Sequence, residues 1–235
     1  MVNNRYRQSW EGFWSEASDA PGEVLWDADP SVTSQRHLEL LTPHIDPALP
    51  IVDVGCGNGT QTRYLATRFA RVVGVDLSQA AVEYARRVDA TTSAEFEQLN
   101  LADIDEVRAL HKQLGDVNVY MRAVLHQCDP EDRAPVAAAV AELVGARGRA
   151  FVLEVASTAR QLIEELARQP SEQVVAAVAH DLKPARTEPG EVEALLRGAG
   201  LEVLASGAAE IVTTLPGPDG GHGALPGEWF VAGRG

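Results

Sequence analysis

The stretch Asp53-Val54-Gly55-Cys56-Gly57-Asn58-Gly59 lies between a short β-branched apolar run and a helical pattern. Its three glycines let the backbone turn sharply and approach a ligand with no Cβ in between. The next apolar run along the chain ends on Asp76, nineteen residues past Gly57. A carboxylate at that place can accept hydrogen bonds from both hydroxyls of a ribose. The glycine turn and the acid together predict a site for a nucleoside-containing cofactor.

Strand patterns alternate with helical patterns on both sides of this turn. Short apolar, β-branched runs predict strands, and apolar positions with a helical period predict helices. Such alternation implies right-handed βαβ units and a parallel sheet. The expected strands are 51–54, 71–75, 95–99, 117–120, 149–155, 201–206 and 229–232, and the expected helices of the core are 60–69, 78–88, 104–114, 133–144 and 189–200.

The length of 235 residues fits one α/β domain. We expect a single domain over 1–235, with an N-terminal helical cap at 1–45, a core at 46–235 and an insert at about 158–187. The segment 215–227 contains three prolines and five glycines and is expected to be a surface loop. Tryptophans are concentrated in the cap, where they can either wall a pocket or simply pack on the core.

Acidic residues outnumber basic ones by 34 to 20, which gives a net charge of −14. This field repels a polyanion, so we expect no nucleic-acid partner. Two cysteines are too few for a disulfide framework or a structural zinc site, and the histidines lack ligand spacing, so no metal is expected. The sequence has no apolar stretch of membrane-spanning length and no signal-like N-terminus. We therefore expect a cytoplasmic monomer or homodimer without membrane contact.

The spacing of the glycines bears on which cofactor binds. The dinucleotide fingerprint has its third glycine three residues past the second, and here that position is Thr60, with Gly59 one place early. NAD(P) is therefore the weaker alternative. The spacing, with Asp53 leading into it, resembles motif I of class I S-adenosylmethionine (SAM)-dependent methyltransferases. The resemblance implies a Rossmann-like three-layer sandwich with a seven-stranded, mostly parallel sheet and an antiparallel last strand.

The same resemblance implies SAM as cofactor and gives the site residues their roles. Asp53 would support the ammonium end of SAM, Asp76 the ribose, and Asn100 the adenine, although the family usually has Asp where Asn100 stands. An Asn can still accept from the adenine amino group and donate to a ring nitrogen. The other residues expected to contact the cofactor are Gly55, Cys56, Gly57, Asn58, Gly59, Leu77, Leu101, Arg122 and Trp14.

The candidate for the chemistry follows the fourth expected strand, in the segment 121–132. This segment resembles the Leu-His-Asp-Trp region of plant-type and bacterial small-molecule O-methyltransferases. The resemblance makes His126 the general base and Glu154 the acid that orients it, but this chain departs from the pattern at Gln127 and Cys128. A neutral imidazole can take the proton of an attacking hydroxyl. A packing role for His126 is the alternative, and His180 in the insert is a second candidate base.

We therefore expect a SAM-dependent enzyme that methylates a small molecule on a hydroxyl oxygen. Methylation of a small amine or a peptide terminus is an alternative that needs no strong base. A SAM-binding protein without transferase activity is another. DNA amino-methylation is not expected, because the Asp/Asn-Pro-Pro-aromatic tetrad is absent where Tyr120-Met121-Arg122-Ala123 stands.

Overall fold

The sheet is seven-stranded over the residues that the computed structural model describes, which are 4–18, 22, 24–89, 94–166, 168, 171–182, 187–217 and 220–235. Its order is β3-β2-β1-β4-β5-β7-β6. The strands are β1 (Ile51–Val54), β2 (Val72–Asp76), β3 (Glu95–Gln98), β4 (Asn118–Arg122), β5 (Arg149–Val155), β6 (Glu202–Pro216) and β7 (His222–Gly233).

The first five strands are parallel, and β7 runs antiparallel to both β5 and β6. This arrangement confirms the predicted Rossmann-like fold with a mostly parallel sheet. The helices are α1 (Asn4–Glu16), α2 (Ser34–Leu41), α3 (Thr60–Leu65), α4 (Gln79–Val88), α5 (Ile104–Leu114), α6 (Pro130–Val144), α7 (Arg160–Leu166), α8 (Glu172–Ala179) and α9 (Glu191–Gly198).

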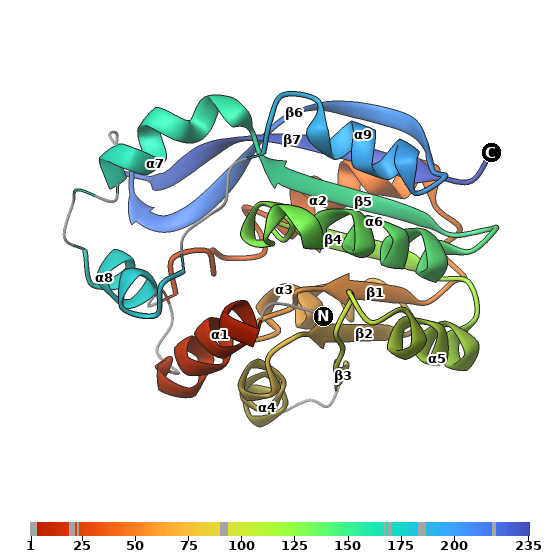
Figure 1. Ribbon diagram of the computed structural model, residues 1–235, viewed down its shortest axis with the longest axis horizontal. Coiled ribbons are helices and arrows are strands. Elements are labelled where there is room, and N and C mark those ends of the chain that lie inside the picture. Colours follow the sequence, from red (N-terminus) through yellow and green to blue (C-terminus); the bar gives the residue numbers. More distant parts are fainter. Residues whose placement is uncertain are drawn as a thin grey trace.

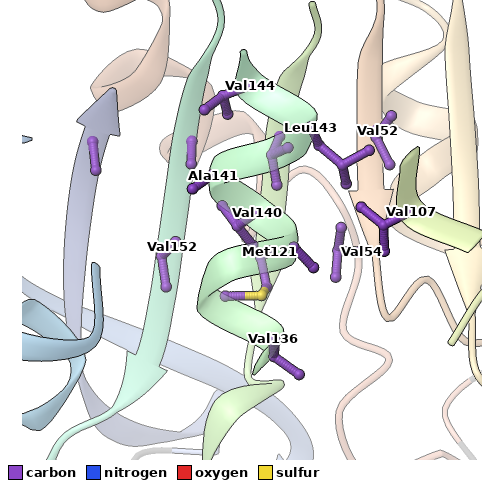
Figure 2. Close-up of a cluster of buried hydrophobic side chains, with 14 of the residues drawn as sticks. Val52, Val54, Val107, Met121, Val136, Val140, Ala141, Leu143, Val144 and Val152 are labelled. Carbon is purple, nitrogen blue, oxygen red and sulfur yellow. The ribbon is translucent and has the colours of Figure 1, made fainter. Parts of the chain in front are cut away.

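Helices cover both faces of the sheet (Figure 1). The helices α5, α6 and α9 pack on one face, and α2 and α3 pack on the other. Figure 2 shows α6 lying on the face of the sheet and running along the strands, and its Val136 and Val140 share one buried cluster with Met121 and Val152 of the strands. Since the central strands are covered on both sides, they are continuous apolar runs rather than alternating ones. Asp53 interrupts this rule, because it is a buried acid inside β1.

One expectation about the fold is wrong. The segment 215–227, expected to be a surface loop, belongs mostly to the hairpin formed by β6 and β7. Gly227 pairs with Val155, the last residue of β5. From Gly227 back to His222, β7 pairs only with β6, so the hairpin extends past the end of β5. Pro216 is tolerated because β6 is an edge strand. Pro226 lies on β7 just beyond its pairing with β5, and its carbonyl still accepts from Ala156 N at 2.9 Å. Residues 218 and 219 lie outside the described residues.

The expected cap contains α1 and α2, and the expected insert contains α7 and α8. Residues 167, 169, 170 and 183–186 of the insert lie outside the described part of the chain. Glu11 ties α1 to the core: its carboxylate accepts from Ser78 Oγ at 2.8 Å and from Ala80 N at 3.2 Å, at the start of α4. Within the described ranges, no helix combines the length and apolar character that crossing a bilayer requires.

Candidate active site

A cavity of about 340 Å³ lies where the carboxyl ends of the parallel strands meet. Residues from the ends of β1 to β5 line it in the order of the sheet, and α1, α7, α8 and the β6–β7 hairpin complete its walls. Ligands bind at this edge of open α/β sheets. The cavity therefore brings together the segments at separate strand ends that the sequence predicted for the site.

The glycine turn needs residues without a side chain, because its neighbours pack closely against it. Gly55, Gly57 and Gly59 have φ angles of +71°, +54° and +77°, a region that favours glycine. A Cβ on Gly55 would lie 2.7 Å from Val124 Cγ2, and one on Gly57 would lie 2.7 Å from Trp14 Cζ2. Gly59 faces away from the cavity. Its Cβ would meet Phe96 at 2.6 Å, so this glycine serves the packing of α3 and α4.

Asp76 links the end of β2 to the glycine turn. Its Oδ2 accepts from Gly57 N and its Oδ1 from Ser78 N, both at 2.9 Å. Burial raises the pKa of this carboxyl to about 6, against the lowering effect of those two N–H groups. A carboxylate has about four lone-pair sites, so both oxygens can still accept further hydrogen bonds from a ligand in the cavity.

Asp53 is the buried acid beneath the turn. Its Oδ2 accepts from Thr62 Oγ1 at 2.6 Å. Burial raises its pKa to about 6, and the nearby charge of Arg122 acts in the opposite direction. Asp53 and Arg122 both line the cavity, so an acidic and a basic side chain lie near each other there.

Three residues that line the cavity carry a buried nitrogen donor with no hydrogen-bond partner among the described residues. The donors are Nη1 of Arg122, Nε1 of Trp14 and Nε1 of Trp10. The other terminal nitrogen of Arg122, Nη2, donates to the carbonyl of Trp26 and fixes the guanidinium in place. Buried donors are nearly always satisfied, so unsatisfied donors on residues that line a cavity indicate a polar ligand. The glycine cradle and these donors fit a small zwitterionic cofactor.

His126 and Glu154 form a buried pair at the end of β4. The two residues are 6% and 1% exposed, and His126 Nδ1 lies 2.8 Å from Glu154 Oε2. Glu154 Oε1 also accepts from Val124 N at 2.8 Å and from Leu125 N at 2.7 Å, so the carboxylate holds the whole turn. Since a carboxylate only accepts, Nδ1 carries the proton in this pair. In the neutral ring, Nε2 is then the acceptor, and Gln127 Nε2 lies 2.8 Å from it.

Other groups near the cavity are poorly suited to take a proton from a hydroxyl. Burial raises the pKa of the Tyr6 phenol well above its usual value and that of the Cys128 thiol to about 12. His37 is buried against Phe151 and bonded to Tyr120, and burial lowers its pKa to about 3. His180 does not line the cavity, and its Nε2 lies 3.1 Å from Glu16 Oε2.

Most of the residues predicted for the site line this one cavity. Gly59 and Glu154 do not, since both lie behind it. Asn100 does, although its oxygen already accepts from Ala102 N at 3.1 Å. The predicted residues that line it are Trp14, Asp53, Gly55, Cys56, Gly57, Asn58, Asp76, Leu77, Asn100, Leu101, Arg122 and His126.

Sequence reasoning missed several polar lining residues, among them Tyr6, Asp27 and Gln61. Asp27 lies outside the sheet, and its Oδ2 accepts from Asn58 Nδ2 at 2.6 Å and from Thr60 Oγ1 at 3.2 Å. It thereby ties the cap to the glycine turn. The neighbouring Trp26, which also lines the cavity, is the one sequence signal near it. No cluster of His, Cys, Asp or Glu arranged to hold a metal ion occurs within the described ranges.

Comparison with known proteins shows which proteins the chain resembles. A family described as "Methyltransferase domain" matches residues 51–148. A SAM-dependent methyltransferase from Anabaena variabilis superposes with a TM-score of 0.90 at 25% identity, over 100% of this chain and 96% of that one. A magnesium protoporphyrin IX methyltransferase from Synechocystis, solved with S-adenosylhomocysteine (SAH), has a TM-score of 0.58 at 17% identity, over 97% and 93% of the two chains. At that identity the likeness shows the fold alone.

Among curated proteins, the chain is 31% identical to a ubiquinone biosynthesis O-methyltransferase from Thiobacillus denitrificans, over 65% of this chain and 64% of that protein. Matches to two other proteins of that name cover 42% and 51% of their lengths, about half. The fold, the cavity and these matches support the prediction of a class I SAM-dependent methyltransferase. The prediction of SAM as cofactor is thereby confirmed at the level of the family.

Proposed function

We propose that the chain transfers the methyl group of SAM to a hydroxyl oxygen of a small molecule, with His126 as general base. The His126–Glu154 pair carries this proposal. It places a histidine of fixed tautomer at the end of β4, with Nε2 as the acceptor atom. SAM supplies an electrophilic methyl group on a good leaving group, so the residues mainly have to align the hydroxyl and accept its proton.

The strand order suggests how the cavity is shared. Residues after β3 would hold adenine, Asp76 after β2 the ribose, and the glycine turn after β1 the amino-acid part. Arg122 Nη1, which lacks a partner among the described residues, would donate to the carboxylate of that part, while Asp53 faces its ammonium group. The hydroxyl would then replace the Gln127 amide at His126 Nε2 and pass its proton there as the new C–O bond forms.

The curated relatives named for O-methylation support a hydroxyl acceptor. The predicted absence of a nucleic-acid partner, the cytoplasmic location, the single domain over 1–235 and the monomer or homodimer stay predictions.

A panel of phenols, aliphatic amines and carboxylic acids tests the acceptor class. SAH release measures turnover, and mass spectrometry of the product identifies the methylated atom. We expect methyl ethers of phenols and little product from the other two classes. Product confined to amines would contradict the proposal and favour N-methylation. SAH binding with no turnover on any acceptor would favour a SAM-binding protein without transferase activity.

A further inference from the structure

Part of the cavity lining comes from segments other than the strand ends and the glycine turn that the proposal assigns to the cofactor. We call this part of the cavity the acceptor compartment. Its walls are the end of β5, the β6–β7 hairpin past the sheet edge, and the helices α7 and α8. The residues that define it are Val155, Ile163, Val174, Ala177, Ile211 and Leu225.

These walls carry no charged side chain among the described residues that line the cavity. The charged lining residues are Asp27, Asp53, Asp76, Arg122 and Asp132, and all of them come from other segments. Among the described residues of these walls that line the cavity, Thr213 is the one polar residue, and its hydroxyl already donates to Gly223 O at 3.1 Å. An ion placed here would lose its water without gaining a partner, which is strongly unfavourable.

The mouth of the compartment is apolar as well. Val178 of α8 lines the cavity and is nevertheless 54% exposed, so it lies at the rim. On the same helix, Val174 is 9% exposed and faces inward, whereas Val175 is 55% exposed and does not line the cavity. The part of the rim that α8 supplies is therefore apolar.

We propose that the acceptor is an uncharged molecule with an apolar body that carries the reacting hydroxyl at one end. The body would fill the acceptor compartment and the hydroxyl would meet His126 Nε2. Acceptors that carry a carboxylate or phosphate on the body would be excluded. The inference rests on the proposed transfer to a hydroxyl, but it can be tested separately because binding requires no turnover.

The test uses 4-methylphenol, 4-propylphenol and 4-pentylphenol, with 5-(4-hydroxyphenyl)pentanoic acid as the charged match of the longest. Calorimetry measures their binding to the SAH-loaded protein. We expect affinity to rise about fourfold per added methylene until the compartment is full. The carboxylate should bind at least 100-fold more weakly than 4-pentylphenol. Equal or tighter binding of the carboxylate, or no binding of any alkylphenol, would overturn the inference.

Two neighbouring variants locate the effect. Val174→Asp should weaken 4-pentylphenol binding at least tenfold, while Val175→Asp, one residue along the same helix, should leave it unchanged. Thermal unfolding of both variants controls for damage to α8. Equal effects of the two variants on binding would contradict the inference. If 4-pentylphenol binds as expected but is never methylated, the proposed transfer fails and the compartment stands. If the charged phenol is methylated preferentially, the transfer stands and the compartment assignment fails.

Discussion

At the scale of single residues, Arg122 offers the most direct view of how the cofactor would be held. One of its terminal nitrogens is fixed by the carbonyl of Trp26, and the other is buried at the cavity without a partner among the described residues. A fixed guanidinium nitrogen matches a carboxylate, because hydrogen bonds between charged groups are the strong ones. The carboxylate of the amino-acid part of SAM is the group that the account assigns to it.

Arg122→Met should lower the affinity for SAH about 10- to 100-fold, which corresponds to about 1.5–3 kcal/mol for a charged hydrogen bond. The decarboxylated analogue of SAH, which retains the amine, should bind the variant and the wild type equally. Calorimetry with both ligands measures this. Equal losses for the two ligands would mean that Arg122 only supports the segment at Trp26, and the assignment to the carboxylate would be wrong.

Asp53 makes a prediction about pH. Its pKa in the folded protein, about 6, is above the ordinary 3.8, so protonation stabilises the folded state. That contribution is complete below pH 3.8 and is lost as the pH rises through about 6. Asp53→Asn lacks this titration. The free energy of unfolding of the variant, minus that of the wild type, should therefore rise by up to about 3 kcal/mol between pH 4 and 6 and then level off. Urea unfolding without ligand measures it, and a difference that does not change with pH would contradict the assignment.

At the scale of elements, the turn after β1 depends on glycine for two reasons that a pair of variants can separate. Gly57 has φ +54° and faces Trp14, whereas Gly190, at the start of α9, has φ +76° and nothing within 4 Å of its Cβ position. Alanine at either place should cost about 1 kcal/mol from the backbone alone.

Only Gly57→Ala should also displace Trp14 and lower SAH affinity, by tenfold or more, with Gly190→Ala as the matched control. Thermal unfolding and calorimetry on both variants give the two readouts. If Gly57→Ala bound SAH as tightly as Gly190→Ala, the contact between the turn and α1 would not matter for the cofactor.

The sequence predicted the elements well where the local pattern and the tertiary environment agree. Strands β1, β2, β4 and β5 are buried along nearly their whole length, so their apolar runs are visible without the fold. The hairpin is different, because its prolines and glycines predict a loop when only the local sequence is considered. Its strand structure comes from the pairing of β6 with β7, which cannot be read from the local sequence. The missed element also supplies one wall of the proposed acceptor compartment.

At the scale of the whole molecule, the site joins parts that are far apart in the chain. Strand-end residues such as Asp76 and His126 could be predicted, because the carboxyl ends of parallel strands meet at one edge. Tyr6, Asp27 and Gln61 could not, since their places depend on how the cap folds back over the glycine turn. The sequence therefore predicts the cofactor half of the site better than the acceptor half.

The role of His126 as the base is the central claim, and the single-turnover rate of methyl transfer tests it most directly. The measurement uses enzyme loaded with SAM and the best phenol of the panel. His126→Ala should be about 10²–10⁴-fold slower than the wild type, while its affinity for SAH changes little. A variant that transfers within a few-fold of the wild type would contradict the account.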